Sequence, residues 1–179
     1  MTQGSAAGPN TIYLLDANVL ITAHRDYYPV KRVPEFWAWL EHHATANRVK
    51  MPAEILDEVK RGRRRPGMDD LLDWLRKDSV RDGLVLDEQP DPGLVRRVME
   101  RGYAPDLRED ELQRLGRDPF LIAYALVEPT RRRIVTTEVS SPKKRRANRK
   151  IPDVAKRFGI ESCDVFQFAR ALDFRTDWR

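Results

Sequence analysis

Short apolar runs alternate with amphipathic helical segments along the chain, and this alternation limits the fold more than any other feature of the sequence. Residues 12–15 form an apolar run that stops at Asp16, as expected for a buried parallel strand. Weaker strand-like runs follow at residues 48–51, 84–86, 134–135 and around residue 160. Such alternation favours a mostly parallel sheet of about four to five strands, covered by helices on both faces. The sequence therefore predicts an α/β fold with three layers.

The helices are expected where apolar residues recur on one side of a helical projection. Pro34 and the pairs Asp91–Pro92 and Asp118–Pro119 are typical helix starts, because proline fits the first turn. Glycine typically follows a helix end. The expected helices begin at residue 34, follow Pro52 as far as Gly62, and cover residues 71–75, 91–102, 118–126, 151–158 and 165–172.

Length and composition predict one domain. The chain has 179 residues, of which 41% are hydrophobic, enough for a single sizeable core. Residues 1–10 resemble a disordered lead-in rather than a signal peptide, which leaves residues 11–179 as the domain. No apolar run approaches the ~18 residues of a membrane helix. The single cysteine excludes an internal disulfide and a Cys-rich zinc site, so we expect a cytoplasmic protein.

Positive charge is concentrated in one segment. The chain carries a formal charge of +5, whereas residues 131–157 alone contain eleven Lys or Arg and two acids, a local excess of +9. A basic segment beside an acidic remainder is typical of proteins that bind polyanions. The alternative is a solvated charged surface without a ligand.

Four acids stand where the strands of such a sheet would gather ligands. Asp16 follows the first strand, Glu58 lies in the helix after the second, Asp118 starts the most apolar helix, and Glu138 follows the strand at 134–135. Open parallel sheets bind ligands at the carboxyl ends of their strands. Mg²⁺ and Mn²⁺ prefer carboxylate and water oxygens. The four acids therefore form a candidate metal site.

Each acid also has a structural explanation. Asp16 could turn the chain after its strand, and Asp118 could cap its helix, a contribution of ~1 kcal/mol. Glu58 competes with Glu54, one turn earlier. Helical projection places Glu58 nearer the apolar stripe, at a half-buried position, and leaves Glu54 in solvent. Glu138 could be a surface acid.

Taken in order, these motifs resemble the PIN-domain nucleases from residue 12 to residue 174. That family opens with an apolar strand, an Asp, a small residue and Asn or Thr, as in residues 14–21, LLDANVLI. Residues 58–62, EVKRG, are similar to its second acidic motif, and Asp118 with the apolar helix behind it to its third. Glu138 after Thr136 and Thr137 matches the last motif in position, although Asp is usual there.

The resemblance implies hydrolysis of RNA phosphodiester bonds with Mg²⁺ or Mn²⁺. Asp16, Glu58 and Asp118 would be the ligands, and Glu138 would contribute directly or through water. Supporting contacts to the ligands would come from Asn18, Thr136 and Thr137. The insert after the last acid would bind the RNA backbone with little base selectivity, through Lys143, Lys144, Arg145, Arg146, Arg149 and Lys150.

The insert and the Lys150-Ile151-Pro152 element resemble an uncharacterised bacterial branch of that superfamily, whose members are often regarded as toxins of toxin–antitoxin pairs. A protein antitoxin and a homodimer are the partners that this resemblance implies. One alternative is a PIN-like module that binds RNA or protein without catalysis. Another is a phosphatase of the HAD-like class, which needs a second Asp where this chain has Asn18.

Overall fold

In a computed structural model of the chain, residues 8, 10–61 and 67–177 are described. Within these ranges, four parallel strands form one sheet in the order β2-β1-β3-β4. The register pairs Ile12 with Arg132 and Leu15 with Val135, so β1 and β3 end side by side. The strand bounds are β1 Ile12–Leu15, β2 Val49–Lys50, β3 Arg132–Val135 and β4 Ser162–Cys163.

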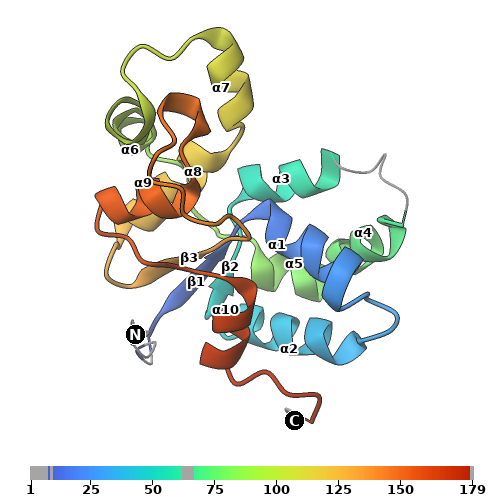
Figure 1. Cartoon of the computed structure of the whole chain (residues 1–179). Coiled ribbons are helices and arrows are strands. Elements are labelled where there is room, and N and C mark those ends of the chain that lie inside the picture. The colour runs from blue at the N-terminus through green and yellow to red at the C-terminus, as the bar shows by residue number, and fades with distance from the viewer. Residues whose placement is uncertain (1–7, 9, 62–66, 178–179) are drawn as a thin grey trace.

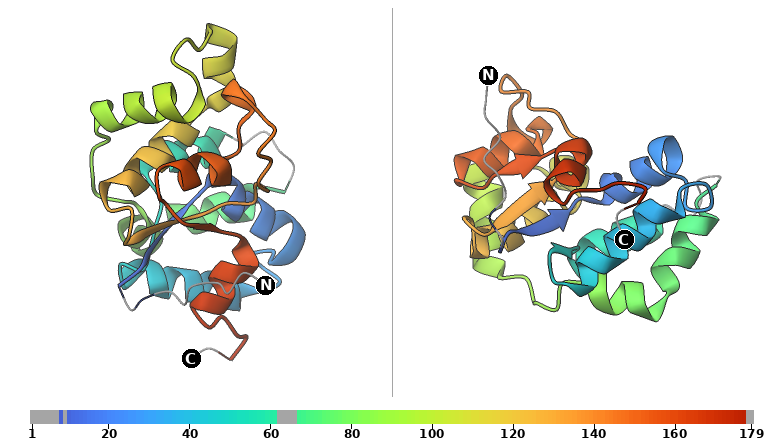
Figure 2. Two further views of the ribbon diagram at one scale, coloured as in Figure 1. Left: turned by 60° about the vertical axis from the view of Figure 1, so that its left-hand side comes forward. Right: turned by 90° about the horizontal axis from the view of Figure 1, so that it is seen from below.

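Helices cover both faces of this sheet, as Figures 1 and 2 show. On one side lie α6 (Pro92–Arg97), α8 (Asp118–Val127) and α9 (Ile151–Arg157), and on the other lie α2 (Pro34–Thr45) and α10 (Val165–Ala171). The predicted α/β class with a central parallel sheet is confirmed. The remaining helical segments are α1 Ala17–Thr22, η1 Ala23–Tyr27, α3 Ala53–Arg61, α4 Asp69–Arg76, α5 Asp78–Leu84, η3 Val98–Tyr103, α7 Glu109–Leu115 and η4 Arg146–Asn148.

The core is strongly aromatic on the side of the sheet covered by α2 and α10. Tyr13 of β1 packs against Phe168 of α10 with 5.1 Å between ring centroids, and Trp39 of α2 lies 5.3 Å from Phe168. All three side chains are almost fully buried. Burial of such rings stabilises the packing of β1 against α10 and of α10 against α2.

Several boundaries differ from the predictions. The strand expected at residues 84–86 is only a bridge between Met51 and Val85, because α5 continues to Leu84. The last strand lies at Ser162–Cys163, two residues beyond its expected centre. Neither α5 nor α7 was expected. The predicted stop at Gly62 and most of the lead-in at 1–10 lie outside the described residues.

Candidate functional site

The register of the sheet brings Asp16 and Thr136 together. Because Leu15 pairs with Val135, the residues that follow them, Asp16 and Thr136, lie side by side beyond the carboxyl ends of β1 and β3. The Thr136 hydroxyl donates a hydrogen bond to Asp16 Oδ2 at 3.0 Å, and both residues are buried. The same hydroxyl oxygen accepts from the backbone N–H of Glu138 at 3.1 Å. The Thr136 hydroxyl thus bonds to two of the four predicted acids, to the side chain of Asp16 and to the backbone of Glu138.

Negative charge at Asp16 is poorly compensated by the protein. Burial raises the pKa of its carboxyl from 3.8 to about 6, and repulsion by Glu58 and Glu138 adds to this effect. The hydrogen bond from Thr136 acts in the opposite direction. Burial and neighbouring negative charge both favour the protonated, neutral form of this carboxyl over the charged form.

Asp118 is the first residue of α8, and the same acids act on it electrostatically. Burial raises the pKa of its carboxyl from 3.8 to about 8, with further increases from Asp16, Glu138 and Glu58. The predicted N-cap role is wrong, because Arg117 occupies the cap position and Asp118 is the first helical residue, without a side-chain capping bond. Its carboxyl is therefore not engaged in capping the turn that it begins.

Glu138 is already engaged by groups of the insert. Its Oε1 lies 2.6 Å from the ammonium of Lys150, and its Oε2 accepts from the backbone N–H of Ile151 at 2.8 Å. The Glu138 side chain is 22% exposed and that of Lys150 is 38% exposed. The longer side chain of Glu, where Asp was expected, thus reaches the start of α9 and holds Lys150 beside the other acids.

Glu58 faces the acids from α3, but it is exposed rather than half-buried as expected. Its charge raises the pKa of both Asp16 and Asp118, so it lies within electrostatic range of the two. Glu54, which was expected in solvent, is half-buried and accepts a hydrogen bond from the Tyr124 hydroxyl at 3.2 Å. Glu58 thus lies near enough to Asp16 and Asp118 to act on them, as predicted. The predicted burial of the two glutamates is wrong, because Glu54 is the more buried one.

Two further residues were predicted to support the ligands. Asn18 is exposed in the first turn of α1, and Thr137 is half-buried. Among the hydrogen bonds of the described residues, none joins either side chain to Asp16 or Asp118. Of the three supporting residues predicted, Thr136 bonds to Asp16 through its side chain, and a backbone hydrogen bond from Asn18 lowers the pKa of Asp16.

The four acids interact electrostatically, but they do not form a complete set of metal ligands. In the described ranges, no three His, Cys, Asp or Glu side chains are placed to hold a metal ion. The donor set nevertheless suits a hard divalent cation, since it consists of carboxylates whose charge raises the pKa of Asp16 and Asp118. Asp16, Asp118 and Glu58 have the donor chemistry for Mg²⁺ or Mn²⁺ although they are not placed here as a ligand set, while both oxygens of Glu138 are engaged.

The basic insert is built into the fold rather than extended into solvent. Arg146 pairs with Asp106 at 2.7 Å and with Glu111 at 2.8 Å, which lowers the pKa of the Glu111 carboxyl to about 2. Arg149 donates to the carbonyl oxygen of Gly102 at 2.7 Å. Of the six residues predicted to bind RNA, Arg146, Arg149 and Lys150 therefore make contacts that hold the insert in place.

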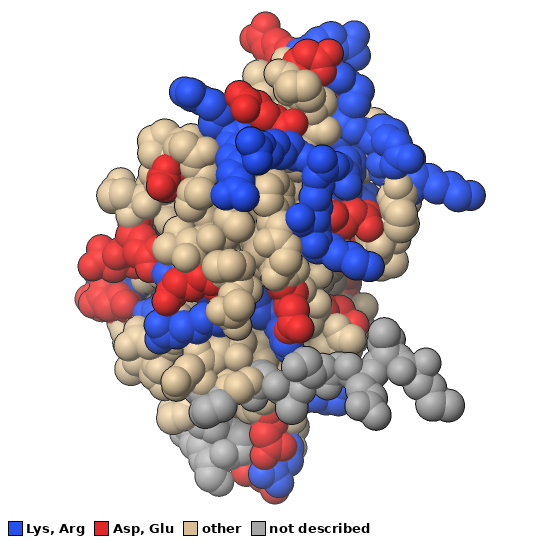
Figure 3. All heavy atoms as spheres, turned by 90° about the vertical axis from the view of Figure 1, so that its left-hand side faces the viewer, with Lys and Arg blue, Asp and Glu red and all other residues tan. Residues whose placement is uncertain are grey.

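The outer part of the insert carries the exposed charge. Lys143, Lys144 and Arg145 are exposed, and within the described residues no acid forms an ion pair with them. Figure 3 shows Lys and Arg side chains gathered on the upper part of the face that carries α6, α7 and α9, with acids between them. We call Lys143, Lys144 and Arg145 the basic loop.

Nothing in the sequence singles out Tyr103, which lies beside the acids. It ends η3 and is 6% exposed, and in the described part of the chain its hydroxyl has no hydrogen-bond partner. Burial raises its pKa further above 10, as do the charges of Asp118, Glu138 and Asp16, while Arg149 lowers it. The hydroxyl therefore stays protonated next to the acids.

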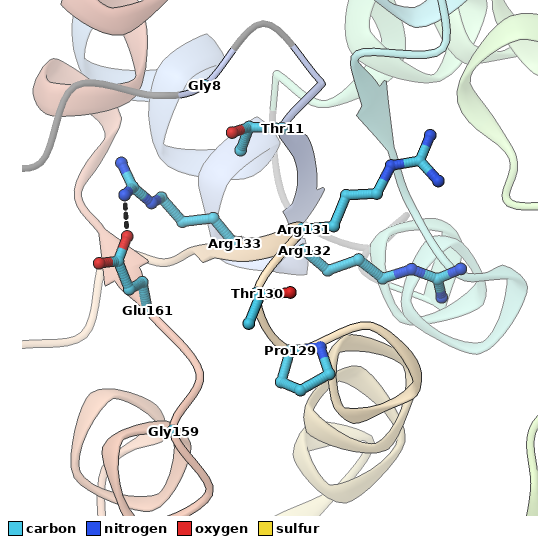
Figure 4. A pocket seen from close by; sticks show the side chains of 9 residues that line it. All are labelled: Gly8, Thr11, Pro129, Thr130, Arg131, Arg132, Arg133, Gly159 and Glu161. Carbon is cyan, nitrogen blue, oxygen red and sulfur yellow. Dashed lines mark hydrogen bonds and ion pairs between the residues drawn. The ribbon is translucent and has the colours of Figure 1, made fainter.

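A separate cavity of about 260 Å³ lies where β1 and β3 begin, at the opposite ends of these strands from Asp16 and Thr136. Figure 4 shows that Arg131, Arg132 and Arg133 line it and that Arg133 is paired with Glu161. Arg131 and Arg132 pair with Glu128. Since these cations already have acidic partners, we assign no ligand to this cavity.

A family model described as a domain of unknown function, DUF4411, matches residues 13–176. The chain belongs to this family. The match runs from the second residue of β1 to beyond α10, so the acids, the insert and Tyr103 all lie within the DUF4411 domain. No curated protein and no solved structure matches the chain. Over the described residues, the domain contains no helix with the length and apolar character to cross a membrane.

Proposed function

We propose that this DUF4411 domain is a metal-dependent endoribonuclease of the PIN type. The observation that carries the proposal is the pair Asp16, at the carboxyl end of β1, and Asp118, at the start of α8, whose carboxyls have strongly raised pKa values and of which Asp16 raises that of Asp118. A divalent cation would offset the repulsion between these neighbouring carboxylates, and hard cations prefer carboxylate oxygens. The resemblance of the ordered acidic motifs to the PIN-domain nucleases supports the same reaction.

The proposed roles follow from the contacts of each side chain. Asp16, Asp118 and Glu58 would hold Mg²⁺ or Mn²⁺, and Thr136 fixes the orientation of the Asp16 carboxylate. Such an ion would supply Lewis acidity, which lowers the pKa of a bound water and neutralises charge on a phosphate. Glu138 holds Lys150 at the edge of the site.

The basic loop would receive the RNA backbone. Its side chains are exposed and cationic, and it belongs to the insert that Glu138 joins to the acids through Lys150. Contacts of this kind bind phosphate without reading bases, so we expect affinity to depend strongly on salt. RNA is thus the substrate that suits both the acids and the loop.

Cleavage of mixed RNAs in the presence of Mn²⁺, Mg²⁺ or EDTA tests the proposal. We expect cleavage with either ion, none with EDTA, and none from Asp16→Asn in any condition. The variant should still bind RNA, because it removes a ligand and also relieves repulsion of phosphate. Wild-type cleavage that persists in EDTA would rule out a metal-dependent reaction, and RNA binding without cleavage in any metal would favour a non-catalytic module.

We further propose that the domain acts as the toxin of a toxin–antitoxin pair, a proposal that follows from the resemblance alone. Expression without its antitoxin should arrest bacterial growth, and Asp118→Asn should relieve the arrest. Equal arrest by the variant at matched expression would show that the acids are not responsible.

A further inference from the structure

Two exposed aromatic side chains from distant parts of the chain contact each other on the surface. Tyr27, at the end of η1, is 48% exposed, and Phe166, the second residue of α10, is 44% exposed. Their ring centroids lie 5.2 Å apart with 78° between the ring planes, an edge-to-face pair. Of the Phe, Tyr and Trp residues that the structure describes, no other is exposed. A contacting pair offers two rings to a ligand in one place, unlike apolar residues that are exposed singly.

The strand register places this pair at the same end of the sheet as the acids. The carbonyl oxygen of Cys163, the last residue of β4, accepts from the backbone N–H of Thr136 at 3.1 Å. Asp164 therefore follows β4 beside Thr136, about 5 Å away across the sheet. Phe166 comes two residues later, at most about 7 Å farther along the chain. Its Cα thus lies within roughly 12 Å of that of Thr136, the residue that bonds to Asp16.

The aromatic core holds both rings in position. The ring of Tyr27 lies 6.3 Å from that of Tyr28, which stacks on the fully buried Phe36 at 4.4 Å. Phe166 belongs to the helix that Phe168 anchors in the core, where its side chain is fully buried. Figure 1 shows α1, which leads to η1, and α10 leaving the same end of the sheet. Rings that are already ordered cost little entropy when a ligand stacks on them.

The charged groups around the pair leave one cation free. Asp26 pairs with Arg25, and Asp164 accepts from the third backbone N–H of α10 as its cap. Arg170 lies one turn after Phe166 on α10 and is exposed, and within the described residues it forms no ion pair. Aromatic rings stack on planar bases, and a guanidinium binds phosphate. The two rings and Arg170 therefore suit a nucleotide.

We propose that Tyr27 and Phe166 stack against a base of single-stranded RNA bound at the acids, with Arg170 beside the phosphate of that nucleotide. This inference names a subsite of the proposed nuclease and rests on that function. The faces of bases are accessible only where RNA is unpaired, so the subsite restricts the substrate to single strands. The basic loop contacts the backbone alone, and the ring pair adds the contact to a base.

A nucleotide fits this surface better than a second protein does. A stable protein interface buries about 1,000 Å² or more around an apolar centre. Here the apolar surface consists of two half-exposed rings, with the charged residues Asp26 and Arg170 beside them. Such a surface is large enough for one base and too small for the centre of a protein interface.

Binding of oligouridine and of the same oligonucleotide built from dihydrouridine tests the inference. Dihydrouridine keeps the phosphates and the ribose but has a puckered, non-aromatic base that cannot stack. We would measure the fluorescence anisotropy of labelled oligonucleotides at one salt concentration, in EDTA so that a metal-dependent reaction cannot proceed. Wild type should bind oligouridine about 10-fold more tightly, as loss of one stacked base predicts.

Variants of the two rings identify the place of stacking. Phe166→Leu keeps an apolar side chain without a ring, so it should bind the two oligonucleotides about equally, and Tyr27→Leu should act in the same way. Phe166→Trp keeps a ring and should retain the preference. Val127→Leu is the matched control, because Val127 is 49% exposed at the end of α8, which leads to the start of β3 and so lies away from the acids. All four should melt near the wild-type temperature, since these side chains are about half exposed.

The outcomes separate this inference from the nuclease proposal. If wild type binds both oligonucleotides equally, or if both leucine variants keep the preference, the stacking subsite is wrong and the nuclease stands. If Phe166→Leu turns a dimer into a monomer in sedimentation and leaves RNA binding unchanged, the rings serve a second copy of the chain, and the inference also fails. If the preference depends on the rings but wild type cleaves no RNA with Mn²⁺ or Mg²⁺, the subsite stands and the nuclease proposal fails.

Discussion

Asp118→Asn should change the pH dependence of stability in the metal-free protein. The pKa of this carboxyl is about 8 in the folded chain against 3.8 for the free group. Between these two values the folded state keeps one proton that the unfolded state has released. The stability that this proton provides is complete below the lower pKa and is lost as the pH rises through the upper one. The free energy of unfolding of wild type therefore falls with rising pH, whereas an amide at 118 contributes no such loss.

The size of the effect follows from the binding of one proton. The steepest slope is about 1.4 kcal/mol per pH unit. With a folded pKa of about 8, the loss between roughly pH 6 and pH 8 is about 2 kcal/mol. This is a large share of the roughly 5–15 kcal/mol that stabilises a domain.

Urea unfolding followed by circular dichroism, in EDTA at several pH values from about 5 to about 8, measures this difference. Asp87→Asn is the control, since Asp87 is an exposed acid outside the site. Asp118→Asn should come nearest to wild type at the acid end and exceed it progressively toward pH 8. Added Mn²⁺ should stabilise wild type at pH 8 and the variant much less. Parallel stability profiles for wild type and Asp118→Asn would refute the reasoning.

Three further predictions concern groups around the acids. Thr136→Val should weaken Mn²⁺ binding by about 10–100-fold in calorimetric titrations, because the Asp16 carboxylate loses its orienting hydrogen bond; unchanged affinity would contradict this role. Changing the basic loop, Lys143, Lys144 and Arg145, to Ala should flatten the plot of log K for RNA against log salt by roughly 0.7 per lost phosphate contact, with the melting temperature retained. Arg146→Ala should instead lower the melting temperature, since Glu111 loses its ion pair; a variant that melts like wild type would show that the insert is held elsewhere.

The sequence predicts best what local pattern determines. The apolar run that becomes β1 ends at Asp16 as expected, and β3 brings Thr136 to its side, because buried parallel strands are short, apolar and in register. The helix α5 was missed because its place depends on packing. Gly83 lies so close to α2 that an added Cβ would be 3.2 Å from the backbone nitrogen of Thr45, a tertiary contact that no local propensity reveals.

The candidate site was predictable in its acids and not in their surroundings. Asp16 and Asp118 follow directly from strand ends and helix starts. The pairing of Arg146 with Glu111 joins residues 35 positions apart, and the pairing of Lys150 with Glu138 depends on how the insert returns to the sheet. A run of positive charge has no geometry in the sequence, so the anchoring cations and the exposed ones look alike until the chain is folded.

The carboxylate of Glu138 connects two parts of the protein that a reader of the sequence would treat separately. It holds the side chain of Lys150 and the first backbone N–H of α9, while its own N–H is tied through Thr136 to Asp16. A shift of Lys150 in the insert is thus transmitted to Asp16 through three successive hydrogen bonds, from Lys150 to Glu138, from Glu138 to Thr136 and from Thr136 to Asp16. Displacement of the basic loop would therefore reach the Asp16 carboxyl through hydrogen bonds rather than through direct contact with it.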